Sequence, residues 1–224
     1  MQEKLSQYDL LARLVPGGAL LWTVNWVLIS SKIGSIPIGQ GGITEAIAFA
    51  LIAYVVGLIL DSLGRWTVEP VLYRIFGKPS RTFLVDDNRI SELDRQHFRT
   101  LATTRVGSDI EFSFEGTKGN EASDFLCRRV IGLFGTADDK VRSMFVQYTL
   151  HRSLTAAMLI VMLSSSYSCI FGMAPFWILG IELALLAILF LGANHWGFRI
   201  VRTTFDQLDR DALGLKSSEK YKDE

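Results

Sequence analysis

Long stretches without charge constrain this chain more than any other feature of its sequence. Residues 14–31 and 46–60 hold no charged side chain, and Glu182 is the sole charge in residues 153–198. The overall composition, 49% hydrophobic and 21% charged, would suit a soluble protein. The charges are segregated, however, and an apolar run of about 20 residues is what a helix needs to cross a bilayer. The segregation therefore predicts a membrane protein.

We predict four transmembrane helices, near residues 10–31, 44–64, 150–172 and 175–197. The apolar stretch from residue 153 to residue 198 is too long for one crossing, because as a single helix it would run about 70 Å. It is predicted to turn at Gly172 and Pro175, which are strong helix breakers. Pro16 lies within the first span and removes a backbone hydrogen bond, so we expect a kink or a break there.

Basic residues flank one side of the predicted membrane region. Lys and Arg follow the second span, precede the third and follow the fourth. The connection between the first two spans holds only Lys32, and the turn between the last two holds none. Since cytoplasmic flanks are enriched in Lys and Arg, both termini and the polar middle are predicted to face the cytoplasm.

The predicted fold is an all-α membrane protein, with two transmembrane hairpins and a mostly helical cytoplasmic insertion between spans two and three. Its divisions are the first two spans within 1–64, a cytoplasmic domain at 65–149, the last two spans within 150–198, and a cytoplasmic tail at 199–224. At the start of the insertion, the segment after span two either continues that span or forms an amphipathic helix along the membrane surface.

Within the insertion, periodicity predicts helices over 89–106 and 120–135. The segment 107–120 alternates polar and apolar residues between glycines, which favours a short strand or an ordered loop. Thr136 is a plausible N-cap, and nothing interrupts the following pattern before span three. We therefore predict one long helix over 137–170 that couples the cytoplasmic part to the membrane part.

No enzymatic motif stands out. The sequence contains no phosphate-binding loop, dinucleotide fingerprint, zinc-protease motif or nucleophile elbow. Cys127 and Cys169, the two cysteines, do not have the spacing of metal ligands, and a disulfide between them is not expected. No catalytic residue, metal or cofactor is predicted, and the formal net charge of zero gives no reason to expect direct nucleic-acid binding.

Glu182 raises the main question about function, because a charge in lipid costs at least about 2.5–3.5 kcal/mol. Counting helical rise from the outer end of each span places it in a polar layer with Asn25, Ser164, Ser165 and Tyr54. In one interpretation Glu182 bonds to Asn25 and the serines and fixes the helix register. In the other, copies from several subunits line a pore. We favour the first.

A second group of residues is predicted at the cytoplasmic interface. Asp61 and Arg65 have the i,i+4 spacing of a helical ion pair. Arg152, His195 and Arg199 end or begin the predicted spans on the same side. We expect these five residues to anchor the topology by interfacial hydrogen bonds.

Three stretches resemble small multispan bacterial inner-membrane proteins similar to the membrane components of anti-phage defence systems: YDLLARLVPGGALL, LYRIFGKPSRTFL and YTLHRSLTAAML. The matching positions are Tyr8, Asp9, Pro16, Gly17, Gly77, Pro79, Ser80, Tyr148 and Arg152. The resemblance covers about a fifth of the chain and carries no catalytic residue. It implies a role in defence and a place in the bacterial inner membrane.

From these observations we expect a non-enzymatic, homo-oligomeric inner-membrane protein that couples a cytoplasmic protein partner to a membrane response in anti-phage defence. The lipid bilayer is its other partner. Two alternatives stay open. The chain could be a small ion channel or transporter with Glu182 lining the path, or a passive membrane anchor for a soluble enzyme.

Overall fold

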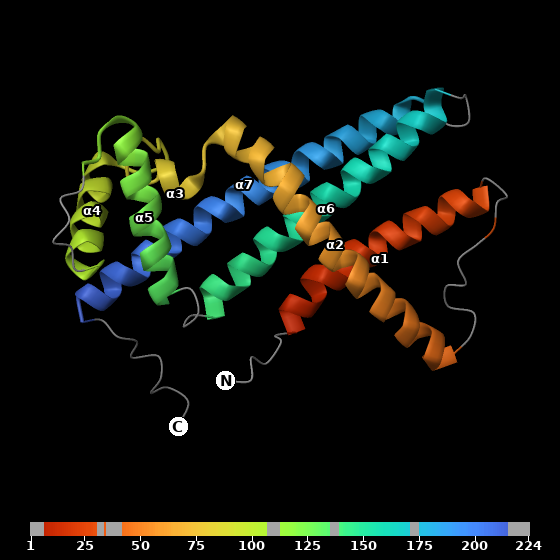
Figure 1. Ribbon diagram of the computed structural model, residues 1–224, viewed down its shortest axis with the longest axis horizontal. Coiled ribbons are helices and arrows are strands. Elements are labelled where there is room, and N and C mark those ends of the chain that lie inside the picture. Colours follow the sequence, from red (N-terminus) through yellow and green to blue (C-terminus); the bar gives the residue numbers. More distant parts are fainter. Residues whose placement is uncertain are drawn as a thin grey trace. The chain divides into compact units, whose positions relative to one another are not determined.

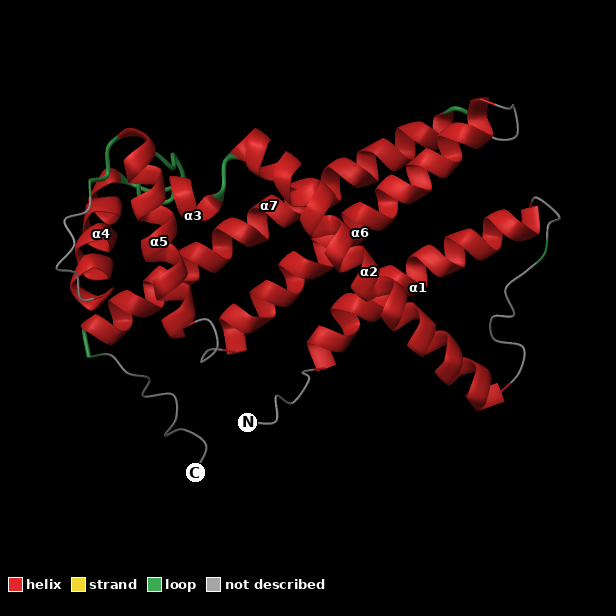
Figure 2. Cartoon of the chain, viewed as in Figure 1, coloured by secondary structure: helices red, strands yellow, loops and turns green. Residues whose placement is uncertain are grey.

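The computed structural model describes residues 7–30, 34, 42–106, 113–134, 139–170 and 175–214, and all regular structure within them is helical (Figure 2). Figure 1 labels the helices, which are α1 (Gln7–Ser30), α2 (Gly42–Phe76), α3 (Pro79–Thr82), α4 (Glu92–Val106), α5 (Gly116–Phe134), α6 (Asp139–Ile170) and α7 (Trp177–Ala212). The predicted all-α class is confirmed.

Four of these helices, α1, α2, α6 and α7, are long and apolar enough to cross a membrane, as predicted. Only 11–28% of the residues in the most apolar window of each are buried within the protein. Their remaining apolar side chains face outward, which suits lipid and is unfavourable in water. The chain has the architecture of a multipass membrane protein.

Two of the membrane helices run well past the spans predicted for them. Helix α2 passes through Pro70 to Phe76, so the segment after span two continues the helix. Helix α7 runs on to Ala212, although the sequence predicted that the span would end near residue 197. Helix α6 begins at Asp139 and ends at Ile170, which agrees with the predicted long helix. The N-cap predicted at Thr136 and the turn predicted at Gly172 lie outside the described residues.

The chain divides into two compact units. Unit 1 comprises Met1–Leu72 and Val146–Asn194, and unit 2 comprises Tyr73–Phe145 and His195–Glu224. All three boundaries fall inside uninterrupted helices, namely α2, α6 and α7. Unit 1 contains the apolar spans, and unit 2 contains α3, α4, α5 and the end of α7.

In unit 1, helices α1 and α2 cross each other (Figure 1), and glycines lie at the contact. A Cβ atom added to Gly17 would overlap the carbonyl oxygen of Ala53, and one added to Gly57 would overlap that of Arg13. Small residues let helix backbones approach this closely, as in membrane helix pairs. The break considered at Pro16 is not present, because α1 continues through this proline.

Unit 2 has its own hydrophobic core. Phe83, Phe98 and Phe205 meet with ring centroids 5.0–5.9 Å apart. Leu126 of α5 packs fully buried in the same cluster. Phe198, Val201, Phe205 and Leu208 also belong to this core, so the start of the predicted tail, up to the end of α7, is a packed helix. Its apolar positions recur at helical spacing, a signal that follows directly on the apolar span.

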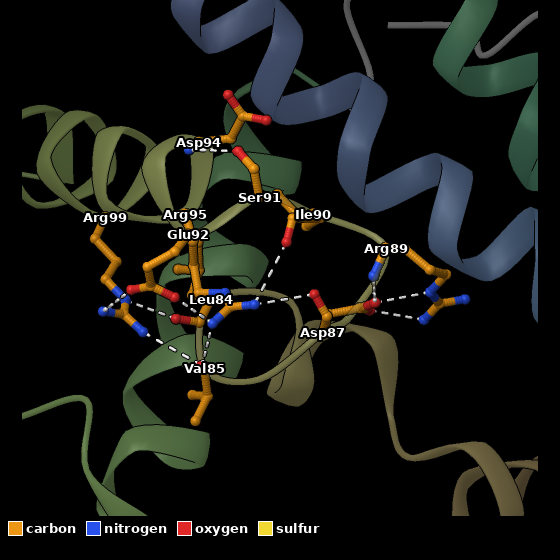
Figure 3. Close-up of polar contacts among 10 residues, drawn as sticks. All are labelled: Leu84, Val85, Asp87, Arg89, Ile90, Ser91, Glu92, Asp94, Arg95 and Arg99. Carbon is orange, nitrogen blue, oxygen red and sulfur yellow. Dashed lines mark hydrogen bonds and ion pairs between the residues drawn. The ribbon is translucent and has the colours of Figure 1, made fainter.

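Two arginines of α4 hold the turn that precedes it (Figure 3). Arg95 donates to the carbonyl oxygens of Val85 and Asp87 at 2.9 and 3.0 Å. Arg99 donates to the carbonyl oxygen of Leu84 at 2.6 Å. Backbone carbonyls left without helical partners are satisfied in this way, and the turn is fixed against α4.

The segment before α5 was predicted to be a short strand or an ordered loop, and its described part is a loop. Residues 107–112 lie outside the described part, but Ser113–Glu115 is irregular and α5 begins at Gly116, earlier than the predicted residue 120. Gly116 has a φ of 56°, a left-handed conformation that glycine adopts readily. Phe114, in the described part of this loop, packs against the core of unit 2.

Alanine substitution at the adjacent residues Gly17 and Gly18 tests the close contact between α1 and α2. We expect Gly17→Ala to lower the free energy of unfolding by about 1–3 kcal/mol, because the methyl group must push the two backbones apart. Gly18→Ala is the matched control, since nothing lies within 4 Å of a Cβ there. It should be neutral or stabilising by up to about 1 kcal/mol through helix propensity. Thermal unfolding in mild detergent measures both, and equal effects would contradict the crossing.

Candidate functional site

A buried charge cluster in unit 1 surrounds Arg152 of α6. Its guanidinium donates to Asp61 through Nη2 and to Glu69 through Nη1. Tyr148, one turn earlier on α6, donates its hydroxyl to Glu69 at 3.1 Å. Arg65 donates to the second oxygen of Asp61 at 3.0 Å. We call these five residues the Arg152 cluster.

The helical spacing explains how the cluster forms. Asp61, Arg65 and Glu69 recur every four residues along α2, and Tyr148 and Arg152 have the same spacing on α6. Residues four apart lie on one face of a helix, so each helix presents its polar groups as one row. The two rows face each other and cross-link the helices.

Burial makes the cluster energetically important. The side chains of Arg152 and Asp61 are only 6% and 7% exposed, whereas Arg65 is 61% exposed. Removing one partner of a buried pair leaves an uncompensated charge, which costs far more than breaking a surface pair. The predicted Asp61–Arg65 pair is confirmed, but it is the exposed edge of a larger arrangement.

Glu69 was not among the predicted site residues. The signal that could have identified it is its place in the four-residue series Asp61, Arg65, Glu69, continued past an apolar span. The second span was predicted to end near residue 64, and the segment that holds Glu69 was expected either to continue that span or to lie along the membrane surface, so this carboxylate was not singled out.

Glu182, near the beginning of α7, lies at a different place in unit 1. Its Oε1 accepts a hydrogen bond from the hydroxyl of Ser165 on α6 at 2.6 Å. Its Oε2 is buried and has no hydrogen-bond partner among the residues that the structure describes. The contact between Glu182 and Ser165, two members of the predicted polar layer, is therefore observed, and it pairs α6 with α7.

The other members of the predicted layer are placed differently. Ser164 lines the same pocket as Glu182 but donates to the carbonyl oxygen of Ile160 on its own helix. Tyr54 accepts a hydrogen bond from Arg13 at 3.2 Å, which joins α2 to α1. Asn25 lies on α1, and its predicted contact with Glu182 stays a prediction. Counting helical rise predicts only the depth of a residue in the membrane. The rotation of each helix about its axis and the crossing angles decide which side chains meet.

Of the predicted interface residues, His195 and Arg199 belong to unit 2. They flank Trp196, with ring centroids 5.7 Å apart for His195 and the guanidinium 5.4 Å from the indole centroid for Arg199. An arginine over an indole face is a favourable cation–π arrangement. Amphipathic tryptophans with flanking basic groups are typical of membrane interfaces.

Unit 2 has a charge cluster of its own around Asp124 of α5. Lys78 lies 2.9 Å and Arg128 2.8 Å from its carboxylate oxygens, and Ser80 also donates to it. Burial opposes ionisation of this carboxyl, but the three hydrogen bonds and the charge of Lys78 lower the pKa of Asp124 to about 2. The cluster ties α5 to the start of α3.

Cys127 and Cys169 are both buried free thiols. Burial raises the pKa of the Cys127 thiol, which suits a packing role. In the part of the chain that the structure describes, no three His, Cys, Asp or Glu side chains are grouped closely enough to hold a metal ion.

Comparison of the chain with protein-family models, with curated proteins and with solved structures found no match. The chemistry of the site therefore has to be judged from its own geometry. Unit 1 contains two kinds of buried carboxylate. Both oxygens of Asp61 accept hydrogen bonds from arginines, whereas Glu182 accepts one from Ser165 and has no described donor for its second oxygen.

Removal of the Arg152 guanidinium tests the importance of the paired carboxylates in the Arg152 cluster. We expect Arg152→Met to lower the free energy of unfolding by about 3–5 kcal/mol, because Asp61 and Glu69 would stay buried without their cation. Arg65→Met is the control and should cost less than about 1 kcal/mol, since exposed pairs contribute little. Detergent-induced unfolding followed by tryptophan fluorescence measures both. Similar losses for the two variants would rule out a special role for Arg152.

Acid unfolding tests the Asp124 cluster. The pKa of Asp124 is lowered in the folded state, so its contribution to stability is fully present above about pH 4 and is lost as the pH falls towards 2. Asp124→Asn should flatten the dependence of the unfolding midpoint on pH in this window. The exposed Asp94→Asn is the control for the loss of one charge. An unchanged pH slope in the Asp124 variant would show that another group is responsible.

Proposed function

We propose that this chain is a non-enzymatic membrane protein that couples events in unit 2 to its membrane-spanning unit 1. The observation that carries the proposal is that α2, α6 and α7 each pass without interruption from one unit into the other. An uninterrupted helix transmits displacement along its axis, whereas a flexible linker absorbs it. Three such helices make coupling the function that this architecture supports best.

The position of the Arg152 cluster along the chain supports the same function. Glu69 precedes the unit boundary in α2 by three residues, and Tyr148 follows the boundary in α6 by three. A shift of either helix would therefore act first on a buried ion pair that has discrete partners. Discrete alternative pairings are the kind of element through which a signal is transmitted between sites.

The setting that we propose comes from the sequence. The Lys and Arg flanks support a cytoplasmic unit 2 with both termini on that side. The resemblance to anti-phage membrane components supports a bacterial inner-membrane effector that forms homo-oligomers and receives a signal from a protein partner. Plaque counts on cells with and without the gene test the defence role, and native mass spectrometry in mild detergent tests the oligomer.

The coupling itself can be tested without knowledge of the partner. Leu126→Ala removes a fully buried side chain from the core of unit 2, on a helix that does not enter unit 1. It should cost about 2–5 kcal/mol and accelerate amide hydrogen exchange in unit 2. If the units are coupled, exchange should also accelerate in residues 64–72 and 146–153 of unit 1, measured on the full chain in lipid nanodiscs.

Leu93→Ala is the matched control, because this leucine of α4 is 78% exposed and its truncation should change exchange in neither unit. Helix α1 is an internal reference, since it lies wholly in unit 1. Faster exchange in the α2 and α6 segments with no change in α1 supports transmission along the shared helices. Acceleration confined to unit 2 would refute the coupling.

A further inference from the structure

A pocket in unit 1 lies between α1, α6 and α7 and is lined mainly by apolar side chains, including Leu20, Val24, Ile160, Val161 and Ile178. Its volume is about 320 Å³, at the lower end of the range of roughly 300–1,000 Å³ for small-molecule sites. Glu182 is the charged residue among the described residues that line it. The pocket is therefore a hydrophobic space with one acid.

The acid is incompletely satisfied. Glu182 is 7% exposed. Ser165 donates to its Oε1, but its buried Oε2 has no hydrogen-bond partner within the described part of the chain. A buried carboxylate oxygen without a donor is costly, because desolvation of a polar group is not offset by a new bond. The pocket thus contains an acceptor that a bound donor would satisfy.

Four hydroxyl groups line the same pocket, and each already donates its single proton. The bonds run from Thr23 to the Ala19 carbonyl at 2.9 Å, from Ser164 to the Ile160 carbonyl at 3.1 Å, from Ser168 to the Ser164 carbonyl at 3.1 Å, and from Ser165 to Glu182. A hydroxyl has one proton and two lone pairs. What these groups can still offer a ligand is therefore acceptor capacity.

We propose that this pocket binds an amphiphile with a primary ammonium group and a hydrocarbon tail. The ammonium group supplies three N–H donors and a positive charge, which match Glu182 Oε2 and the hydroxyl lone pairs. The tail fills the apolar space between α1 and α6. An anion would meet the Glu182 carboxylate, and an alcohol would bring one donor and no charge, so both fit less well. Binding at this site does not depend on the coupling proposed above.

Native mass spectrometry of the full chain in mild detergent tests this with dodecylamine, dodecanol and dodecanoate as probes. One dodecylamine should bind per chain, and dodecanol should bind about tenfold or more weakly, because charged hydrogen bonds contribute about 1.4 kcal/mol or more beyond neutral ones. Dodecanoate should not bind at the site. Glu182→Gln should lose about tenfold in affinity for the amine, while Glu45→Gln, an exposed glutamate of α2, should keep it.

A second variant, Val161→Phe, tests the proposal independently in case Glu182→Gln does not fold. Val161→Phe keeps the carboxylate but fills the apolar space, so it should also weaken dodecylamine binding. Equal binding of dodecanol and dodecylamine, or full binding by both Glu182→Gln and Val161→Phe, would overturn the proposal.

Competition with lipids identifies the source of the amine. Displacement of dodecylamine by phosphatidylethanolamine but not by phosphatidylcholine, whose trimethylated nitrogen has no N–H donor, indicates a lipid ligand. Displacement by neither indicates a free amphiphilic amine. Equal displacement by both would show that the tail alone is recognised and would overturn the proposal.

Discussion

The buried guanidinium of Arg152 is the constraint on which the arrangement of unit 1 depends. A charge in a low-dielectric interior is tolerated only when it is paired and hydrogen-bonded, and both of its partners, Asp61 and Glu69, come from a single other helix. The two carboxylates lie eight residues apart on α2, so one side chain fixes both the register and the rotation of α6 against α2. The glycine crossing packs α1 against the same helix, α2.

The carboxylates of the chain differ in how fully their surroundings satisfy them. Asp124 in unit 2 is surrounded by donors, which lower its pKa to about 2. Asp61 is held between two arginines. Glu182 accepts a hydrogen bond from a serine on one oxygen, and no described residue donates to the other. A buried carboxylate whose two oxygens both accept hydrogen bonds stabilises the fold, whereas a buried carboxylate with one oxygen lacking a donor is suited to bind a ligand. This contrast separates the binding proposal at Glu182 from the structural role of the other two.

The motifs that suggested a resemblance to other membrane proteins lie at packing and hydrogen-bonding junctions. Gly17 is where α1 and α2 touch. Ser80 bonds to Asp124 in unit 2. Tyr148 and Arg152 bond to Glu69. Short motifs of this kind specify how helices meet and carry no reaction chemistry. They explain why the sequence was more informative about architecture than about activity.

The sequence by itself determined the all-α class, the four apolar helices and the long uninterrupted α6, because these depend on hydropathy and helical propensity within one segment. The Asp61–Arg65 pair followed in the same way from local spacing. Only the tertiary structure decided that Tyr54 accepts a hydrogen bond from Arg13 and that Oε2 of Glu182 has no donor among the described residues. Depth along a span can be counted from sequence, but crossing angles and rotation about each helix axis are set by side-chain packing between segments distant in the chain.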